Sequence, residues 1–582
     1  MKLEYEELLK DVGKMSPKPN MLDYGDIYQN FDWKEIEGQL KSLDDGKANM
    51  AYECIDKHLE TELKDKLAFI WEGLDGAIEK YTFARFSEET NKFANLLKKH
   101  GIKKGDRVFV FLERVPELYV VFFGVLKIGA IIGPLFSAFG PEAVKDRLED
   151  SGAKLLITSP NLKRKVKSIL HELPDLHHLV IVNKRGGPVE YEDKDICYEK
   201  EMAEASTSFE IEPTNREDYS VMHYTSGTTG KPKGVVHAHQ AIIGQYATAK
   251  YALDLKEDDI YWCTADPGWV TGTSYGMFGP WSNGVTQILY EGGFNASKWY
   301  QIIQDYKVTA WYTAPTAIRM LMKAGDELPG QYDLSRLRHI CSVGEPLNPE
   351  AVVWGEKAMG LAFHDNWWQT ETGAIMIANY AIQNIRPGSM GRPFPGIQAD
   401  ILDDQYNPVP AGEEGQLALK PGWPSMFRTY WNREDYYNSR FKNDWYITGD
   451  KAYKDEDGYF WFVGRADDVI NTAGHLVGPF EVESVLIQHP AVAEAGVIGK
   501  PDPIVMEVVK AFVSLKEGYV QSEQLRREIR VFVKKKLAGW ACPREIDFLD
   551  SLPKTRSGKI MRRLLKSRDL GLPDGDISTL ED

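Results

Sequence analysis

A segment rich in glycine and hydroxyl side chains could bind phosphate. It reads Tyr224-Thr-Ser-Gly-Thr-Thr-Gly-Lys-Pro-Lys-Gly234 and directly follows the apolar segment 219–223. Glycines let backbone amides approach a phosphate group closely, while the hydroxyls and the two lysines add donors and positive charge. The segment is not a Walker A loop, because its second position is Thr instead of Gly and Pro232 stands where that motif has Ser or Thr. It predicts a phosphate-binding loop of another kind.

Further segments combine charged, aromatic and glycine residues later in the chain. They are Trp367-Trp-Gln-Thr-Glu-Thr-Gly373, Tyr446-Ile-Thr-Gly-Asp450, Gly464-Arg465 with Asp467, and Leu552-Pro-Lys-Thr-Arg-Ser-Gly-Lys559. Taken singly, Asp450 is typical of a turn, Lys559 of a solvated surface and a tryptophan pair of core packing. Only the set of segments favours a binding site over these ordinary roles.

In order and spacing, these segments resemble the motifs of the adenylate-forming superfamily, which includes acyl-CoA synthetases, luciferases and peptide-synthetase adenylation domains. The resemblance covers most of the chain between residues 81 and 563. Segments 342–346 and 367–373 are similar in particular to the acetate-activating branch of that superfamily. The resemblance implies an AMP-forming ligase that makes acetyl-CoA from acetate, ATP and CoA through acetyl-AMP, with release of pyrophosphate.

Three alternatives remain beside this reading. The same chemistry could act on propionate or on another short, branched or aromatic carboxylic acid. A carrier-loading adenylation module is a second alternative, although no carrier segment follows Lys559. A non-catalytic adenylate-binding protein is the third, and the presence of Lys559, Asp450 and Glu371 argues against it.

The resemblance also assigns roles to residues. Lys559 would neutralise charge between the substrate carboxylate and the α-phosphate, an electrostatic contribution that is usually large in such catalysis. Glu371 would hold ATP-bound Mg²⁺, Asp450 would accept the ribose hydroxyls, and Asp467 would be the hinge of a small C-terminal domain. The nucleotide-binding set is Thr225, Ser226, Gly227, Thr228, Thr229, Gly230, Lys231, Gly344, Glu345, Pro346, Asp365, Asn366, Trp367, Trp368, Gln369, Thr370, Asp450 and Arg465.

Acyl, CoA and separate metal contacts follow from the same resemblance. Trp368 would close the acyl pocket, leaving room for an acid of two or three carbons. The acyl pocket is Val270, Thr271, Val343 and Trp368; the CoA contacts are Lys163, Arg164, Lys165, Thr271, Asn295, Ala473, Gly474 and Lys534; a second Mg²⁺ would lie at Ile487, His489 and Val492. The chain departs from the pattern at Leu476, where acetate-activating relatives typically have an arginine that contacts ATP phosphates.

Alternating strand and helix patterns must position these residues. Segment 106–112 is a strand pattern, Pro116 begins a helix through Leu126, and 131–136, 153–158 and 179–183 are further strands. Strands that recur after helices predict a parallel α/β sheet. Short strands with Gly, Pro and Asp turns follow at 396–402 and 415–419, and a helix is expected over 479–488.

The expected fold is therefore α/β: a large N-terminal domain of α/β subdomains plus a β-rich subdomain, with a small mobile α+β C-terminal domain. The predicted divisions are an N-terminal extension packed on the main domain over 1–80, an adenylate-forming domain over 81–466, and the mobile domain over 467–582. A short helical pattern spans 31–43 in the extension.

The composition favours an enzyme that acts on small molecules. The chain has 582 residues, a net charge of −16 and 43% hydrophobic residues, which excludes general disorder. Residues 526–568 carry a net +10, so a cationic surface could close on a nucleotide, whereas the −26 of the remainder disfavours nucleic acid. The apolar stretch 118–139 is interrupted by Lys127 and is expected to be a buried helix and strand, not a membrane insertion.

Five scattered cysteines without a CxxC pair, and no visible secretory signal, predict a reducing cytoplasmic setting. The expected partners are the substrates acetate, ATP and CoA, with Mg²⁺ accompanying ATP. Exposure of Lys559 in an open state would also make it a target for a lysine acetyltransferase and deacetylase, since acetylation removes the charge.

Overall fold

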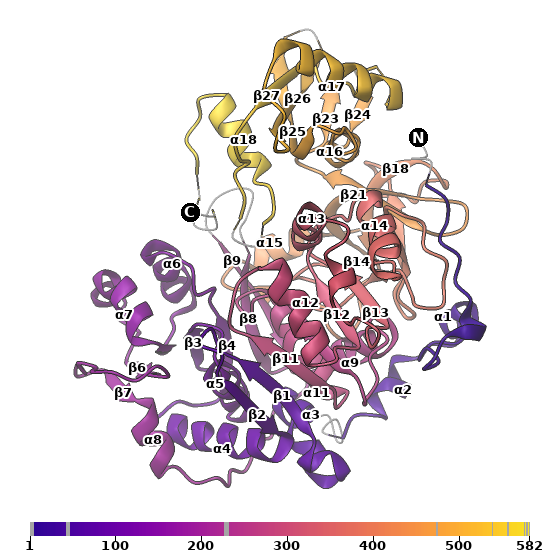
Figure 1. Ribbon diagram of the computed structural model, residues 1–582. Helices are drawn as coiled ribbons and strands as arrows, with labels where there is room; N and C mark the ends of the chain where they lie inside the picture. The colour runs from indigo at the N-terminus through magenta and orange to yellow at the C-terminus, as the bar shows by residue number, and fades with distance from the viewer. Residues whose placement is uncertain are drawn as a thin grey trace.

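The computed structural model describes residues 5–41, 47–225, 232–472, 475–503, 505–537, 539–555, 558–575, 577 and 580, without the side chain of Leu476. Within these residues the chain forms three β-sheets with helices packed against them (Figure 1). The first two sheets and their helices form a large body, and the third lies with helices α16 to α18 at the top of Figure 1. This is the expected mixed α/β fold.

The sheet with order β19-β9-β8-β4-β3-β5-β6-β7 contains the first α/β unit. Its strands from β8 to β7 pair in parallel, and β9 and β19 add an antiparallel edge. The bounds are β3 Arg107–Phe111, β4 Ile131–Pro134, β5 Leu155–Thr158, β6 His178–Ile181, β7 Asp195–Cys197, β8 Tyr219–Thr225, β9 Lys233–Ala238 and β19 Thr429–Tyr430. The predicted strands and their parallel pairing are confirmed.

Helix α5 (Pro116–Lys127) explains the long apolar stretch. Eleven of its twelve residues are buried, and β4 follows it, so the predicted buried helix and strand are confirmed. Lys127 is accommodated without exposure because its ammonium lies 2.8 Å from a carboxylate oxygen of Asp56. No described helix is long and apolar enough to cross a membrane.

The second large sheet has a parallel half and an antiparallel half. In the parallel half, the order β14-β13-β12-β10-β11-β1 brings together strands from distant parts of the chain. The bounds are β1 Leu67–Glu72, β2 Ile78–Thr82, β10 Ile260–Cys263, β11 Thr286–Tyr290, β12 Ala310–Thr313, β13 His339–Ser342 and β14 His364–Trp367. Ligand sites in such sheets form beyond the carboxyl ends of the strands.

The antiparallel half is the expected β-rich region. It continues from β14 through β15, β16, β22, β21 and β18 to β17, with β20 paired to β21. The bounds are β15 Ile377–Ala378, β16 Ser389–Pro393, β17 Ala399–Leu402, β18 Glu414–Leu419, β20 Phe441–Lys442, β21 Trp445–Lys454 and β22 Phe460–Arg465. The strands predicted at 396–402 and 415–419 are thus confirmed within three residues.

The helices of the large body pack on both sheets. Their bounds are α1 Tyr24–Asn30, α2 Trp33–Glu37, α3 Met50–Cys54, α4 Phe83–Lys99, α6 Pro141–Ser151, α7 Pro160–Val166, α8 Tyr198–Glu204, α9 Ala241–Tyr251, α10 Val270–Thr273, α11 Gly279–Ser282, α12 Ala296–Asp305, α13 Pro315–Ala324, α14 Pro349–Met359 and α15 Glu434–Ser439. Helix α2 covers part of the pattern predicted at 31–43, and residues 42–46 lie outside the described chain.

The N-terminal segment lies against the large body. Leu8 forms a β-bridge with Ile385, and the hydroxyl of Tyr24 donates to the carbonyl of Pro393. The division of the chain at residue 80, with 1–80 as an extension packed on the main domain, stays a prediction.

The C-terminal part has a core of its own. A five-stranded sheet contains β23 Ile470–Thr472, β24 His475–Val477, β25 Val492–Asp502, β26 Met506–Leu515 and β27 Glu545–Phe548. Helices α16 Pro479–Ile487, α17 Glu523–Lys536 and α18 Arg562–Asp569 belong to the same part. Its principal buried cluster contains only residues between Ile470 and Ile546, whereas the main cluster of the body ends at Phe460. Two separate cores allow two parts of a chain to move relative to each other.

Candidate active site

The nucleotide-binding candidates gather where β13 and β14 end. Val343 to Pro346 directly follow β13, and Trp368 to Thr370 directly follow β14, its parallel neighbour. Strand β21 brings Asp450 to the same place, and Asp450 pairs in register with Arg465 at the end of β22. Segments separated by more than a hundred residues in sequence therefore meet at one edge of the sheet.

Asp450 is the most firmly held member of this group. Its side chain is only 5% exposed, and its carboxylate accepts hydrogen bonds from Trp367 Nε1 at 3.0 Å and Gln369 Nε2 at 2.9 Å. Arg465 adds a third donor at 3.1 Å. Burial opposes the charge of Arg465, but the carboxylates of Asp450 and Asp467 outweigh it and raise the pKa of the guanidinium. The guanidinium thus remains charged, and its contact with Asp450 orients both side chains.

Glu371 has a carboxylate that suits Mg²⁺. Its Oε1 accepts a hydrogen bond of 2.8 Å from the hydroxyl of Tyr430, and Oε2 has no hydrogen bond from the described residues. Mg²⁺ is typically bound by one or two carboxylates together with substrate phosphates. The Glu371 carboxylate therefore fits the predicted Mg²⁺. Tyr430, which belongs to β19 of the first sheet, orients this carboxylate. Nothing in the sequence around Tyr430 indicates this contact.

The loop that carries Thr370 and Glu371 is anchored to several elements. His237 Nε2 lies 2.8 Å from the carbonyl of Thr370, and the carbonyl of Gly373 accepts from Ser274 Oγ at 3.1 Å. Gly373 has φ +70°, and a Cβ there would lie 2.3 Å from the carbonyl oxygen of Ser425. Only glycine fits this position, so the loop is held in one place.

Trp368 is surrounded by polar aromatic side chains. Its ring is edge-on to Tyr275 at 5.1 Å, and its Nε1 donates to the hydroxyl of Tyr312 at 3.3 Å. Tyr312 in turn donates to Asn366 Oδ1 at 2.8 Å. The other predicted acyl-pocket residues are Val270 and Thr271 at the start of α10 and Val343 after β13, and their contact with an acyl group stays a prediction.

Asp365 and Glu345 lie on the side predicted for adenine. Asp365 is 5% exposed, and its Oδ1 lacks a hydrogen-bond partner among the described residues. Burial raises the pKa of its carboxyl above the usual range, although the backbone amide of Leu347 opposes the shift. Gly344 has φ +99°, a left-handed conformation that favours glycine between Val343 and Glu345.

Lys559 reaches the site on a loop docked against α13. The hydroxyl oxygen of Thr316 lies 3.0 Å from the carbonyl oxygen of Gly558 and 2.6 Å from Glu345 Oε1. Lys559 is an exposed residue, but its ammonium lies among protein groups and has no hydrogen bond or ion pair to the described residues. Desolvation by the surrounding protein, followed by the charges of Arg465 and Arg562, lowers the pKa of Lys559.

Most of the predicted phosphate loop lies outside the described residues, namely Ser226, Gly227, Thr228, Thr229, Gly230 and Lys231. Thr225 ends β8 and pairs with Lys233, which begins β9. The ammonium of Lys233 lies 4.6 Å from the ring centroid of Tyr436. A hollow of about 540 Å³, lined by Lys233 and residues 432–436, adjoins these two strand ends.

The predicted CoA contacts lie in different environments. Lys163 is 8% exposed and its ammonium lies 2.5 Å from Asp195, so the lysine is committed to an ion pair. The predicted phosphate contact of Lys163 stays a prediction, and it would require this ion pair to open. Arg164, Lys165 and Asn295 remain predictions, as does the exposed Lys534 in the last turn of α17, while Ala473 and Gly474 lie outside the described residues.

The second predicted metal site has little support from side chains. His489 Nδ1 accepts the backbone N–H of Ala491 at 3.2 Å, so a neutral ring carries its proton on Nε2 and neither nitrogen is free to bind a cation. Ile487 ends α16 and Val492 begins β25, where only their carbonyls could serve. Among the described residues, no group of three or more His, Cys, Asp or Glu side chains could hold a metal ion. The site stays a prediction.

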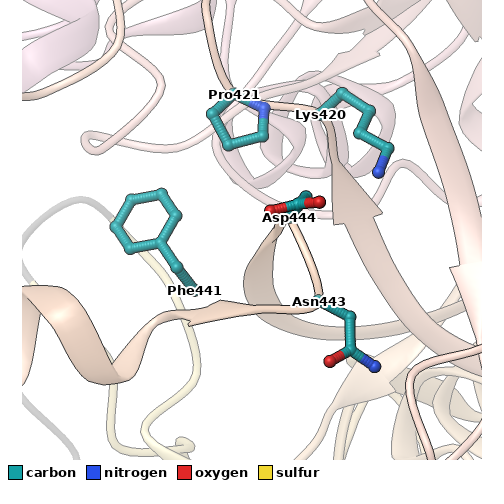
Figure 2. A pocket seen from close by; sticks show the side chains of 5 residues that line it. All are labelled: Lys420, Pro421, Phe441, Asn443 and Asp444. Atoms are coloured by element: carbon teal, nitrogen blue, oxygen red, sulfur yellow. The ribbon is translucent and has the colours of Figure 1, made fainter.

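Another hollow has a volume of about 640 Å³ (Figure 2). It is lined by Lys420, Pro421, Phe441, Asn443 and Asp444, beside the turn that joins β20 and β21. None of the predicted site residues lines it. The chemistry is therefore expected at the strand ends and not in this hollow.

The family described as "AMP-binding enzyme" matches residues 56–431, and "AMP-binding enzyme C-terminal domain" matches 481–559. An acetyl-coenzyme A synthetase of Bacillus subtilis strain 168 is 53% identical over 576 residues, covering 99% of this chain and 100% of the relative. One of Pyrobaculum arsenaticum is 44% identical, covering 92% of this chain and 85% of the relative.

Solved structures agree with these sequence matches. A Brucella canis acyl-CoA synthetase is 37% identical with a TM-score of 0.74, covering 95% of this chain and 99% of its own. An anthranilate CoA ligase in complex with anthranoyl-AMP is 33% identical with a TM-score of 0.83, covering 91% of this chain and 99% of its own. The likeness therefore includes both the large body and the C-terminal part.

Proposed function

The chain belongs to the family of AMP-binding enzymes, and we propose that it is an AMP-forming acetate–CoA ligase that makes acetyl-CoA from acetate, ATP and CoA. The observation that carries this proposal is the convergence of Asp450, Glu371 and the Lys559 loop at one edge of the sheet. Relatives named acetyl-coenzyme A synthetase support the choice of acetate.

In the proposed first step, the acetate carboxylate attacks the α-phosphate of ATP and pyrophosphate leaves. Two anions must approach each other, so a cation between them lowers the barrier. Among the described residues, no carboxylate forms an ion pair with the Lys559 ammonium, so this cation is available for the role. Asp450, held by Trp367 and Arg465, would accept the ribose hydroxyls and hold the nucleotide in place.

Asp365 and Glu371 are the residues proposed to contact the adenine and the Mg²⁺. Asp365 Oδ1 is buried and has no hydrogen-bond partner in the part of the chain that the structure describes, so it would accept a hydrogen bond from the exocyclic amino group of adenine. Glu371 would hold Mg²⁺, which would neutralise charge on the bound phosphates. Tyr430 keeps the Glu371 carboxylate turned toward that position.

Trp368 is proposed to set the length of the acid. Its indole is fixed between Tyr275 and Tyr312, so it cannot swing away to admit a longer chain. Propionate remains the nearest alternative substrate, since one methylene in an apolar pocket discriminates by only about 1–3 kcal/mol.

In the second step, the thiol of CoA would displace AMP after the C-terminal domain turns about Asp467. The side chain of Asp467 is 44% exposed and lies between the two separate cores, where few contacts oppose a backbone change. A domain boundary at 466/467 is part of this proposal, and the two separate cores support it. Arg164, Lys165, Asn295 and Lys534 are the described residues proposed to meet CoA.

Regulation and location are also part of the proposal. Lys559 is exposed, so an acetyltransferase could reach it and remove the charge that the first step requires. All five cysteines are free, in keeping with a reducing cytoplasm. Mass spectrometry of Lys559 in protein purified from its own cells, and fractionation of those cells, would test these two points.

The function is tested by measuring pyrophosphate release over a panel of carboxylic acids, with and without CoA. Acetate should support the highest rate, and CoA should convert the bound adenylate to acetyl-CoA with AMP as the other product. A higher rate with propionate or an aromatic acid would reassign the substrate and keep the chemistry. No acid-dependent pyrophosphate release would refute the function.

A further inference from the structure

Arg440 is an arginine near the nucleotide site that none of the motifs includes. It follows α15 and lies opposite Ile447 at the base of the β20–β21 hairpin, where the amide of Ile447 donates to the Arg440 carbonyl at 2.8 Å. Its side chain folds back over β21, and NH2 donates to the carbonyl of Ile447 at 2.5 Å. A hydrogen bond with the hydroxyl of Tyr446 is its other polar contact, and neither partner carries a negative charge.

The charge of Arg440 is not balanced by a carboxylate. No acidic side chain of the described residues lies within 4.0 Å of the guanidinium, and its buried Nε has no hydrogen-bond partner. Two other buried arginines, one of the same region and one of the C-terminal part, have close anions: Arg319 lies 2.7 Å from Glu345, and Arg562 lies 2.5 Å from Glu483. A desolvated cation without a counterion is costly, unless a ligand supplies the negative charge.

The position of the guanidinium indicates which ligand this could be. A Cβ built on Gly449 would lie 3.1 Å from NH2 of Arg440 and 3.5 Å from NH2 of Arg465. Two guanidinium groups therefore approach the same point of β21, one residue before Asp450. Arg465 is compensated by Asp450, whereas Arg440 is not. Positive charge is in excess at this point.

Polar groups around Arg440 connect it to the phosphate side of the site. The Tyr446 ring centroid lies 5.8 Å from its Cζ, and the phenols of Tyr430 and Tyr436 are close enough to influence its charge. Burial opposes its charge, but these phenols and the Glu371 carboxylate raise its pKa. Tyr430 is the residue that donates to Glu371.

The same aromatic residues lead to the end of the phosphate loop. Tyr430 lies against Tyr436 with ring centroids 4.9 Å apart, and Lys233, the first residue of β9, lies over the Tyr436 ring. Arg440 is thus on the side of Glu371 and Lys233, where the phosphates of ATP would be, and not on the side of the uncharged base.

We propose that Arg440 binds the β- and γ-phosphates of ATP, and the pyrophosphate formed from them, and so supplies the positive charge that Leu476 cannot. This rests on the proposed function, because it assumes that the site binds ATP at Glu371. An arginine suits this role, since its planar group can donate two hydrogen bonds to one phosphate.

The test is the ligand dependence of binding to Arg440→Met, measured by calorimetry at fixed Mg²⁺. Affinity for ATP and for inorganic pyrophosphate should fall about ten- to a hundred-fold, because charge-assisted hydrogen bonds are lost. Affinity for AMP should change less than about two-fold, since AMP has no β- or γ-phosphate. Arg440→Lys should recover part of the ATP affinity.

Arg386→Met is the matched control. Arg386 is also partly buried, but it is paired with Asp455 at 2.7 Å and Asp457 at 2.5 Å, away from the strand ends. Its loss should leave ATP, pyrophosphate and AMP binding unchanged. Thermal unfolding of all three variants checks that the fold is retained.

Two results would overturn the proposal: unchanged ATP and pyrophosphate affinity in Arg440→Met, or equal weakening for ATP, pyrophosphate and AMP. The second would mean that Arg440 only fastens the β20–β21 hairpin. These binding measurements do not use acetate or CoA. A failure of the acetate assay with normal ATP binding would therefore reject the proposed substrate and leave the Arg440 result interpretable.

Discussion

The ribose side of the site and the catalytic lysine are held in opposite ways. Asp450 lies in the large body, is almost fully buried, and is fixed by hydrogen bonds from Trp367, Gln369 and Arg465. Lys559 lies on a loop of the C-terminal part, is exposed, and has no side-chain partner among the described residues. The body is thus organised before the nucleotide binds, whereas the lysine depends on the substrate anions for its final position.

The contacts between the two parts explain the difference. Beyond the chain connection, the described polar contacts include Thr316 with Gly558 and Asn348 with Ser484, at 3.0 Å and 2.9 Å. Neither contact is an ion pair, and each part has its own hydrophobic core. A domain held by few contacts can leave its position between two half-reactions at little cost in free energy.

The largest effect is expected from Lys559→Ala. Adenylate formation from ATP and acetate should fall by about 10²–10³-fold or more, because the charge between the two anions is lost. The same variant supplied with acetyl-AMP should still make acetyl-CoA at a near-normal rate. Rapid-quench measurement of both half-reactions checks this division.

If both half-reactions fell equally, Lys559 would not belong to the first step alone. The wild-type pH profile adds a second check, since the pKa of Lys559 is lowered. Adenylate formation should decline as the pH rises through that lowered pKa, because the charged form is lost, and the thioester step should not share this decline.

Gly558→Ala should weaken the docking of the loop without removing Lys559. Gly558 has φ +88°, and a Cβ there would lie 2.3 Å from Thr316 Cγ2. The misplaced lysine should reduce adenylate formation by about ten- to a hundred-fold. Thioester formation from acetyl-AMP should be unaffected. Gly575→Ala is the control, because Gly575 lies in the same part of the chain and also has a positive φ that strains an alanine. A normal first step in Gly558→Ala would show that the docked loop is not the catalytic arrangement.

In the body, Trp368→Gly should change selectivity instead of abolishing one half-reaction. Removal of the indole opens an apolar space, and each methylene added to the acid could gain about 1–3 kcal/mol relative to acetate. Rates with acids of four to six carbons should rise while the rate with acetate falls. Full activity with unchanged acetate preference would assign Trp368 to packing alone.

Tyr312→Phe should give the smallest effect. The variant keeps the ring but removes the hydroxyl that accepts from Trp368 and donates to Asn366. Loss of these hydrogen bonds costs about 1 kcal/mol each, and the freed indole should raise kcat/KM for propionate relative to acetate several-fold. Steady-state kinetics with both acids measures this ratio. An unchanged ratio would mean that Trp368 is positioned by packing and not by Tyr312.

Short-range patterns predicted many of the elements that carry the site. Helix α5 begins at Pro116 as expected and ends one residue beyond the predicted Leu126, and α16 begins at Pro479. A proline at the first helical position and a regular spacing of apolar residues are local features of the sequence. They favour a helix whatever the position of that helix in the fold. Together with the ordered motifs, they were enough to predict the α/β class and the type of reaction.

Partners that are distant in sequence could not be predicted in this way. Tyr430 orients Glu371, Tyr312 holds Trp368, and Lys163 is bound to Asp195 instead of being open to a phosphate. Each of these contacts depends on strands or loops that only the sheet order brings together. Residue type and local spacing were sufficient to predict the motifs and the helices and strands. The pairing of charges and hydrogen bonds across the site was decided only by the folded chain, because such contacts depend on distances between segments that are far apart in sequence.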